Sequence, residues 1–276
     1  MVDVRSLVNG VPTGLACVLD RGFSYGDGLF ESVRFVGATA PLWSRHMQRL
    51  SGDCARLLLP APDPAVLWNE ALLVARGMQH CVVRITLTRG VGARGYALPD
   101  NVSATRVVAA CAPPQIFAAA YDRGIRARVC ELRLAEQPAL AGMKTLNRLE
   151  QVLARAEWHD PDIAEGILRA DDGRVISATM ANVFAVIDGQ LLTPALDRCG
   201  IAGVGRAEVL ATDVHPRVAR LSLEDLYNAS EIFLSSSVRG IVPVRSINTK
   251  QFMPSALTRR LQQHWRDLGF PLENAA

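Results

Sequence analysis

The sequence predicts an α+β protein built of two domains. Strand-like runs and hairpin signals alternate with helical segments in both halves of the chain, which is typical of this class. Between the halves, "PPQIFAAAYDRG" combines paired prolines with a closing glycine, so we expect it to be a connection. The predicted domains are residues 1–113 and 124–276, joined by residues 114–123.

Turn and cap signals divide the first half into its elements. Asn9-Gly10 lies between apolar residues, as in a two-residue hairpin turn, and the glycine-rich stretch "LDRGFSYGDG" predicts a loop. Ser44 is the expected N-cap of a helix that Pro60 ends. The expected elements are a hairpin around residues 9–10, a loop over 19–28, strands over 29–36, 81–90 and 104–112, and helices over 44–59 and 64–78.

The strand "LFESVRFV" has two different faces. Successive side chains of a strand point to opposite sides, so Phe30, Ser32 and Arg34 share one face. The other face carries apolar residues: Leu29, Val33 and Phe35.

The second half contains the same mixture of elements. Asp188-Gly189 marks the tip of a hairpin, and "IRARVCELRL" and "EGILRA" read as strands. The expected elements are strands over 125–134, 165–170, 218–221 and 231–235, a hairpin over 182–194, and helices over 147–158, 206–212, 223–229 and 255–268.

The composition excludes several classes of protein. The 276 residues are 49% hydrophobic and 21% charged, the balance of an ordinary globular protein. The net charge of +3 and the scattered arginines do not predict a nucleic-acid partner, whereas small anionic ligands are compatible. The N-terminus lacks the apolar core of a signal peptide and no stretch is long enough to span a bilayer, so we expect a cytoplasmic protein with no membrane partner.

The six cysteines show neither a CxxC pair nor the spacing of metal ligands. Most of them lie in apolar runs. We therefore expect reduced cysteines in the core and no metal site.

Lys144 follows Gly142 in a chain that uses arginine almost everywhere else. Asn147 and Glu150 resemble a capping box at a helix start, so Lys144 is expected three residues before the N-cap. The positive end of the helix dipole would there disfavour the charged amine, as suits a lysine that forms a Schiff base or acts as a general base. By position alone, a solvated loop lysine is the more common case.

Three segments offer sites for an anion. Arg45 and His46 occupy the first turn of the helix over 44–59, where acidic residues are expected. Gly203 and Gly205 free backbone N–H groups at a helix start, and the strand end "SSSVRG", residues 235–240, offers hydroxyls. Each segment also has an explanation without a ligand: Arg45 can be a surface residue, the glycines can mark an ordinary helix start, and the serines can form a turn. Together with Lys144 they suit a lysine-bound phosphorylated cofactor, of which pyridoxal phosphate is the natural candidate.

Six segments in a fixed order support the same cofactor. They are "DRGFSYGDGLFESVR", "RHMQRL", "TRGVGARGY", "AGMKTLNRLEQVLARAEW", "ANVF" and "CGIAGVGR". Together they closely resemble the 4-amino-4-deoxychorismate lyase family, a branch of the fold-type IV pyridoxal-phosphate enzymes that also include branched-chain and D-amino-acid aminotransferases. The resemblance covers residues 7–244. It implies the two-domain architecture of a D-amino-acid aminotransferase, with pyridoxal 5'-phosphate between the domains, and a homodimer.

The resemblance also assigns roles to residues around the cofactor. Lys144 matches the Schiff-base lysine, which also acts as general base, and Asn182 matches an asparagine near the cofactor ring. The phosphate contacts match the side chain of Arg45, the backbone at Val204 and Gly205, and the hydroxyl of Ser237 with Ser236 beside it.

The activity implied by the resemblance is the conversion of 4-amino-4-deoxychorismate to 4-aminobenzoate and pyruvate, a step of folate biosynthesis. Phe30, Ser32 and Arg34 match the strand face that lines the substrate side, and Tyr25 and Arg94 match the edge of the pocket. The substrate carries two carboxylates, for which the candidate partners are Arg34, Arg94 and Arg239.

One position departs from the family pattern. The family usually places a glutamate beside the pyridine nitrogen, five residues before the asparagine, and this chain has Ser177 there. A hydroxyl bonds the nitrogen without forcing its protonation. Transamination depends strongly on a protonated cofactor ring. An elimination depends on it less when the substrate ring becomes aromatic. Ser177 therefore favours the lyase over the alternatives, an aminotransferase acting on D- or branched-chain amino acids or a cofactor-binding protein without catalysis.

Overall fold

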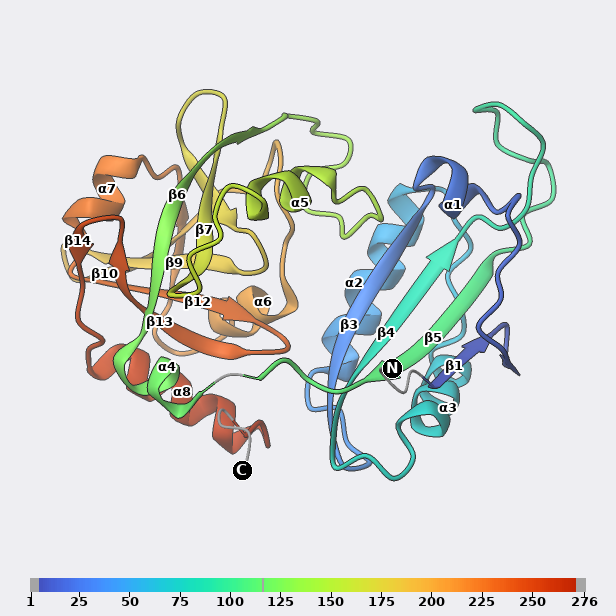
Figure 1. The fold of residues 1–276 in the computed structure, drawn as a ribbon, viewed down its shortest axis with the longest axis horizontal. Coiled ribbons are helices and arrows are strands. Elements are labelled where there is room, and N and C mark those ends of the chain that lie inside the picture. The colour runs from blue at the N-terminus through green and yellow to red at the C-terminus, as the bar shows by residue number, and fades with distance from the viewer. Residues whose placement is uncertain (1–4, 116, 272–276) are drawn as a thin grey trace. The chain divides into compact units, whose positions relative to one another are not determined.

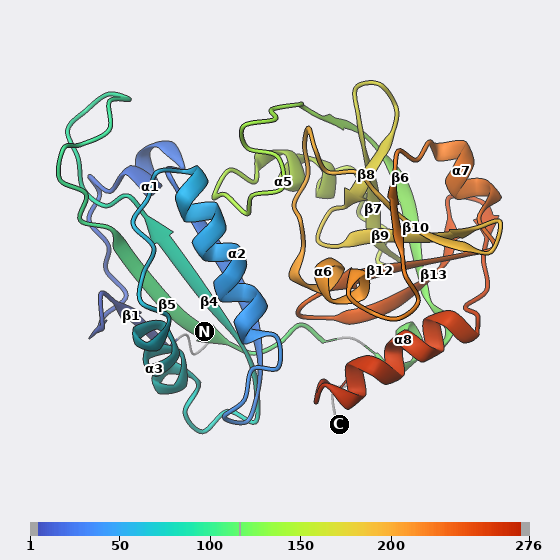
Figure 2. The same ribbon diagram turned by 180° about the vertical axis from the view of Figure 1, so that it is seen from behind.

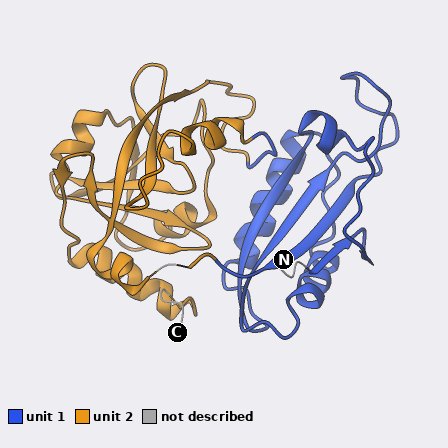
Figure 3. Ribbon diagram, viewed as in Figure 1, with its two compact units in different colours: residues 1–113, 144–147 blue, residues 114–143, 148–276 orange. Residues whose placement is uncertain are grey.

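In the computed structural model, which describes residues 5–115 and 117–271, the chain divides into two units. Unit 1 comprises residues 1–113 and 144–147, and unit 2 comprises residues 114–143 and 148–276 (Figure 3). Residues 144–147 thus belong to unit 1 although the chain on both sides of them belongs to unit 2.

Unit 1 is built on a five-stranded antiparallel sheet in the order β2-β1-β5-β4-β3. The predicted hairpin is confirmed, because Asn9 and Gly10 both have positive φ and join the first two strands. β3 is an edge strand of this sheet. The strands are β1 (Arg5–Val8), β2 (Val11–Pro12), β3 (Gly28–Val36), β4 (His80–Thr88) and β5 (Thr105–Cys111).

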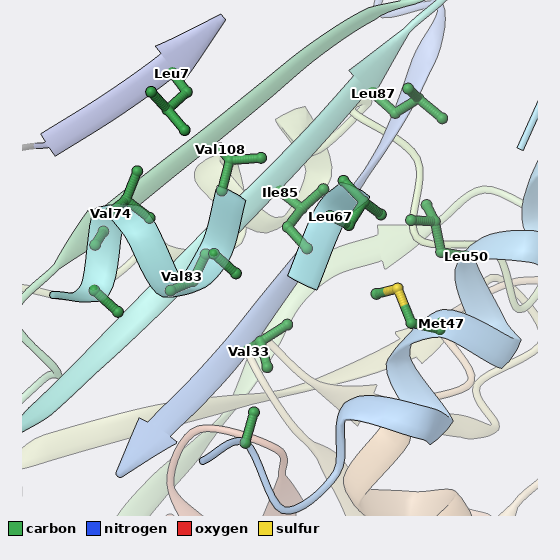
Figure 4. Packing of buried hydrophobic residues seen from close by; sticks show 14 of the residues in the cluster. Leu7, Val33, Met47, Leu50, Leu67, Val74, Val83, Ile85, Leu87 and Val108 are labelled. Atoms are coloured by element: carbon green, nitrogen blue, oxygen red, sulfur yellow. The ribbon is translucent and has the colours of Figure 1, made fainter. Parts of the chain in front are cut away.

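Two helices, α2 (Trp43–Arg56) and α3 (Pro64–Ala75), cover one face of this sheet (Figures 1 and 2). Met47 and Leu50 of α2 and Leu67 of α3 point toward the strands, where they meet buried residues such as Ile85 (Figure 4). The predicted alternation of β3 is confirmed, since its apolar residues 29, 33 and 35 all lie in this core. Its other face, with Phe30, Ser32 and Arg34, is turned away from the two helices.

Two local predictions in unit 1 are wrong. The predicted loop over residues 19–28 contains a short helix, α1 (Arg21–Tyr25), because the Asp20 side chain accepts the N–H of Gly22 and caps it. Ser44 is not an N-cap, since α2 starts one residue earlier, at Trp43, and its N-cap residue Leu42 has no side-chain hydrogen bond.

Unit 2 contains a nine-stranded mixed sheet in the order β11-β10-β9-β12-β13-β6-β7-β8, with β14 paired to β13. The hairpin at Asp188-Gly189 is confirmed between β9 and β10. β8 and β13 were not predicted. The strands are β6 (Ile125–Leu134), β7 (Ile163–Ala170), β8 (Val175–Ala178), β9 (Asn182–Ile187), β10 (Gln190–Pro194), β11 (Arg217–Ala219), β12 (Glu231–Ser236), β13 (Gly240–Ile247) and β14 (Lys250–Gln251).

The helices of unit 2 are α4 (Ala118–Arg123), α5 (Leu149–Arg155), α6 (Val204–Leu210), α7 (Leu223–Asn228) and α8 (Ala256–Asp267). The expected connection over residues 114–123 therefore contains a helix. Its Tyr121 is buried and donates its hydroxyl to the carbonyl oxygen of Arg239 at 2.7 Å, which ties α4 to unit 2.

All six cysteines are free thiols, and four of them are buried as expected. Cys17 is an exception, because it lies exposed in the segment before α1. Burial raises the pKa of Cys54 and Cys130 to about 12, so these thiols stay protonated. Over the described ranges, no helix has the length and apolar character needed to cross a membrane.

Candidate active site

Lys144 is held by main-chain hydrogen bonds along the free edge of β3. Phe30 donates its N–H to the carbonyl oxygen of Lys144 at 3.0 Å, and Leu146 donates its N–H to the carbonyl oxygen of Gly28, also at 3.0 Å. Residues 144–147 thus extend the sheet of unit 1 by one short segment, which is the physical reason that they belong to this unit (Figure 3).

The amino group of Lys144 lies over an aromatic ring. Its Nζ is 4.1 Å from the centroid of the Phe30 ring. The guanidinium carbon of Arg84 on β4 is 4.0 Å from the same centroid. Both distances are within the range of a cation–π contact. Lys144, Phe30 and Arg84 therefore form one group on the sheet face that α2 and α3 leave uncovered.

Arg84 is a residue that sequence reasoning missed. It lies within the predicted strand over 81–90, but its neighbourhood depends on the register of β3 against β4, which places it opposite Ser32. It is exposed, donates to the Thr86 hydroxyl at 3.3 Å, and forms no ion pair with any acidic side chain of the described residues. The sequence feature that could have singled out Arg84 is its place as a charged residue within a largely apolar strand.

A buried polar cluster connects β3 to α2. Glu31, which is 1% exposed, accepts a hydrogen bond from His46 Nδ1 at 2.6 Å and two from Arg49. Burial alone would raise the pKa of Glu31, but the charge of Arg49 and the hydrogen bonds from Arg49 and His46 outweigh it and hold this pKa at about 2. Burial lowers the pKa of His46 despite the neighbouring carboxylate. The cluster is therefore an ionised Glu31 with a neutral imidazole and a guanidinium.

This cluster changes the interpretation of the first predicted anion site. His46 was expected to attract an anion together with Arg45, but it is completely buried against Glu31. Arg45 is half-buried in the first turn of α2, and its contact with phosphate stays a prediction. Arg49 lies one turn further on the same side of the helix. Another turn on, Asp53 accepts the backbone N–H of Lys144 at 3.0 Å.

The predicted capping box beside Lys144 is wrong. The helix α5 starts at Leu149, and its N-cap residue Arg148 makes no side-chain hydrogen bond. Glu150 instead accepts the backbone N–H of Ala135 at 2.8 Å, because the end of β6 lies against the first turn of α5. The helix-dipole argument for Lys144 therefore loses its local basis, and the edge of β3 takes the place of the cap.

Tyr25 and the loop that carries Arg94 lie next to each other in unit 1. The Tyr25 hydroxyl accepts the N–H of Gly95 at 3.1 Å, and the rings of Tyr25 and Tyr96 are 5.5 Å apart. Arg21 donates to the carbonyl oxygen of Gly95 at 2.8 Å. The two predicted pocket-edge residues are thus brought together by the backbone of this loop, with Arg94 itself exposed.

In unit 2, the start of α6 is packed against β9 and β12. Asn182 donates to the carbonyl oxygen of Ile201 at 2.9 Å and accepts the N–H of Gly203 at 3.1 Å. A Cβ atom on Gly205 would come within 2.8 Å of the backbone of Ser236. Only glycine permits this approach, so the backbone of Gly205 lies directly beside the end of β12. The structure therefore brings together four predicted cofactor residues: Asn182, Val204, Gly205 and Ser236.

Arg239 has a partner of its own in the turn after β12. Its guanidinium is 3.3 Å from the carboxylate of Glu165, which also accepts the hydroxyl and the backbone N–H of Thr179. The backbone N–H of Arg239 donates to the Ser236 hydroxyl at 3.0 Å. Arg239 thus orders this turn, and its contact with a substrate carboxylate stays a prediction, as does the phosphate contact of Ser237.

Ser177 lies in β8, opposite Leu168 of β7, and is 8% exposed. Sequence reasoning placed it at the ring nitrogen without predicting the strand that holds it. This four-residue strand keeps the Ser177 backbone in a sheet, and the place of its hydroxyl at a ring nitrogen stays a prediction.

Comparisons with known proteins identify the class. The family described as amino-transferase class IV matches residues 28–247, so the chain belongs to this family. It is 35% identical to the aminodeoxychorismate lyase of Vibrio harveyi over 264 residues, which cover 92% of this chain and 97% of that protein.

Solved structures give the same result. The crystal structure of 4-amino-4-deoxychorismate lyase from Pseudomonas aeruginosa is 42% identical, with a TM-score of 0.90 over 95% of this chain and 98% of that one. A branched-chain amino acid aminotransferase from T.th., complexed with N-(5'-phosphopyridoxyl)-L-glutamate, shares the fold at 24% identity and a TM-score of 0.82, over 97% and 94% of the two chains. The expected fold-type IV architecture is confirmed.

Proposed function

We propose that this chain is a pyridoxal-phosphate-dependent lyase that converts 4-amino-4-deoxychorismate to 4-aminobenzoate and pyruvate. The observation that carries the proposal is the setting of Lys144: its main chain is fixed to β3, and its amino group lies over Phe30 on the sheet face opposite α2 and α3. The relatives from Vibrio and Pseudomonas carry the name of this reaction. We assign this reaction to folate biosynthesis.

The residues present fit a pyridoxal phosphate. In unit 2, the glycine backbone at the start of α6 lies directly beside Ser236, where a Cβ atom on Gly205 would come within 2.8 Å of the Ser236 backbone. We assign the phosphate to the N–H groups of Val204 and Gly205 and to the hydroxyls of Ser236 and Ser237. For Arg45 of unit 1, a phosphate contact stays a prediction.

The ring of the cofactor is assigned to two further residues of unit 2. Asn182 already bonds Gly203 and is held in place beside the start of α6. The hydroxyl of Ser177 pairs with the pyridine nitrogen. When bound, the cofactor draws electrons from the carbon that carries the substrate's amino group. A serine at the nitrogen favours an elimination that ends in an aromatic ring over transamination.

Lys144 moves the proton. With pyridoxal phosphate bound, the Nζ of Lys144 would act as the free amine that takes the proton from the amine-bearing carbon of the substrate. The carbon–oxygen bond to the enolpyruvyl group breaks and the ring becomes aromatic. The Nζ of Lys144 then returns the proton to the methylene carbon of the released fragment, which gives pyruvate.

Arginines on the face of the unit 1 sheet opposite α2 and α3 suit the two carboxylates of the substrate. Arg84 is exposed, is not paired with a carboxylate of the described residues, and shares the Phe30 ring with Lys144. We add it to the predicted partners Arg34, Arg94 and Arg239. Guanidinium groups bind carboxylates with two parallel hydrogen bonds, so they fix the orientation of the substrate as well. Phe30, Ser32 and Tyr25 complete the substrate side.

We also propose that the enzyme is a cytoplasmic homodimer. Helix α5 exposes Leu149, Val152 and Leu153, which are 76%, 61% and 60% accessible. Their spacing puts them on one helix face, and an apolar face of this kind suits an interface between protein chains. A second copy of the chain is the expected occupant. Sedimentation of the purified protein would reveal a monomer if this part is wrong.

The test is a spectrum and a coupled assay on one preparation. The chain has only two lysines, Lys144 and Lys250, and the second lies exposed on β14. Lys144→Ala is expected to abolish both the yellow absorbance of the lysine-bound cofactor and pyruvate release from aminodeoxychorismate. Lys250→Ala should change neither. Pyruvate release at near the wild-type rate in Lys144→Ala would sink the assignment, and turnover of amino donors with 2-oxoacids instead of pyruvate release would favour the aminotransferase.

A further inference from the structure

The main chain of Lys144 is fixed from two directions. On one side, Phe30 donates its N–H to the Lys144 carbonyl, and Thr145 pairs with Leu29 in an antiparallel bridge. These contacts orient the carbonyl of the lysine and the residues after it. The N–H of Lys144 is held by a different element of unit 1.

A side chain of α2 takes up this N–H. Asp53, which is 7% exposed, accepts it with Oδ2 at 3.0 Å. Burial raises the pKa of the Asp53 carboxyl, and the hydrogen bond from Lys144 acts against this rise because it favours the ionised form. A carboxylate acceptor makes a stronger hydrogen bond to a backbone N–H than a neutral carbonyl does. The lysine is thus connected to β3 through its carbonyl and to α2 through its amide.

The two supports are themselves joined by the buried cluster around Glu31. Glu31 follows Phe30 on β3, and its carboxylate bonds His46 and Arg49 of α2. Asp53 lies one turn beyond Arg49 on the same side of this helix. The position of the Asp53 carboxylate relative to Phe30 is therefore fixed by buried groups, so a shift of Lys144 along the edge of β3 would break the bond to Asp53.

We propose that Asp53 is a positioning residue, which anchors the amide of Lys144 so that its amino group stays over the Phe30 ring. This inference rests on the proposed function of Lys144 as the cofactor-binding lysine. Without the Asp53 acceptor, the start of the segment 144–147 separates from the sheet edge. The amino group is then correctly placed for a smaller fraction of the time, although Lys144 itself is unchanged.

The first measurement needs no cofactor. Amide hydrogen exchange of the peptide that contains Lys144 is followed in the cofactor-free full chain, for the wild type, Asp53→Ala and Asp53→Asn. Asp53→Ala is expected to speed exchange of the Lys144 amide about tenfold, the effect of losing one such hydrogen bond. Asp53→Asn keeps an acceptor oxygen and should stay within about threefold of the wild type.

The second measurement follows the chemistry of the lysine. Pyridoxal phosphate is added to each protein, borohydride fixes the cofactor to the lysine at set times, and mass spectrometry counts the labelled Lys144. Labelling should be about tenfold slower in Asp53→Ala and nearly unchanged in Asp53→Asn. The matched control is Asp63→Ala, which removes another aspartate that accepts one backbone N–H, that of Ala65 at 2.8 Å, in the same unit. This control should lower the melting temperature and leave Lys144 exchange and labelling unchanged.

Two outcomes decide the proposal. Wild-type exchange and labelling at Lys144 in Asp53→Ala would overturn it, and so would an equal loss in Asp63→Ala. If Asp53→Ala does not fold, Asp53→Leu, which restores the volume without an acceptor, replaces it with the same expectations. The hydrogen-exchange result does not depend on turnover. A wild-type protein that releases no pyruvate would refute the proposed reaction. The role of Asp53 would still be decided by hydrogen exchange at the Lys144 amide.

Discussion

The lysine region of unit 1 and the start of α6 in unit 2 are built by opposite means. Around Lys144, buried charged side chains hold the structure, with Glu31, Arg49 and Asp53 joining a helix to a strand edge. At the start of α6, backbone groups and glycines do so, as Gly205 shows by its contact with Ser236. Removal of a charge should therefore destabilise the first region. Addition of a single carbon atom should disrupt the second region.

The largest expected effect is that of Glu31→Gln in unit 1. The pKa of Glu31 is about 2 in the folded protein, below its ordinary value of 4.5. The ionised carboxylate therefore stabilises the fold above about pH 4.5, and this stabilisation is lost as the pH falls toward 2. The substitution should cost about 3 kcal/mol of unfolding free energy near neutral pH.

Urea unfolding of both proteins near pH 7 and near pH 3 measures this difference, which should shrink at the lower pH. Glu70→Gln is the control, because Glu70 is also a buried acid of unit 1 and accepts a hydrogen bond at 2.6 Å from Arg106 of β5, a strand that β4 separates from β3. It should lower stability without changing cofactor labelling of Lys144. A Glu31→Gln protein as stable as the wild type at both pH values would contradict the role of buried charge.

The next effect is that of Gly205→Ala in unit 2. The new Cβ atom would lie 2.8 Å from the backbone of Ser236, which cannot move without disturbing β12. We expect a loss of about tenfold or more in affinity for pyridoxal phosphate, measured by titration of the cofactor-free protein.

A matched control for Gly205→Ala exists in unit 1. Gly52 is also a helical glycine, in α2, and a Cβ atom there would meet nothing within 4 Å. Gly52→Ala should raise the unfolding free energy by up to about 1 kcal/mol and leave cofactor affinity unchanged. Equal cofactor affinities in the two variants would show that the close approach at Gly205 has no part in binding.

The smallest effect is expected for Arg84→Ala. Arg84 contacts Phe30 and Thr86 but forms no ion pair with a described carboxylate, so its loss should cost little stability. If it binds a substrate carboxylate, KM for aminodeoxychorismate should rise about tenfold while the lysine-bound absorbance stays unchanged.

Arg126→Ala provides the comparison for Arg84→Ala. It removes the same charge from an exposed pair with Asp162, at 3.4 Å. Its KM should equal that of the wild type. If Arg84→Ala also leaves KM unchanged, Arg84 does not bind the substrate, and the other predicted arginines stay as the candidate partners of its carboxylates.

Much of the fold could be predicted because its signals are local. The hairpins at Asn9-Gly10 and Asp188-Gly189 and the apolar face of β3 follow from turn chemistry and from the two-residue repeat of a strand. The failures have local causes too. Asp20 caps a helix too short to leave a periodic pattern, and Glu150 bonds Ala135 rather than its own helix start.

The sequence by itself showed that Lys144 stands out among arginines, and it predicted that the glycines at the start of α6 and the serines at the end of β12 offer an anion site. Those properties belong to single residues and short segments. Only the tertiary structure decided that residues 144–147 join the edge of β3, that His46 is bonded to Glu31 rather than open to an anion, and that Arg84 shares the Phe30 ring with Lys144. Each of these depends on strand register or on contacts between segments far apart in the chain, which local patterns do not specify.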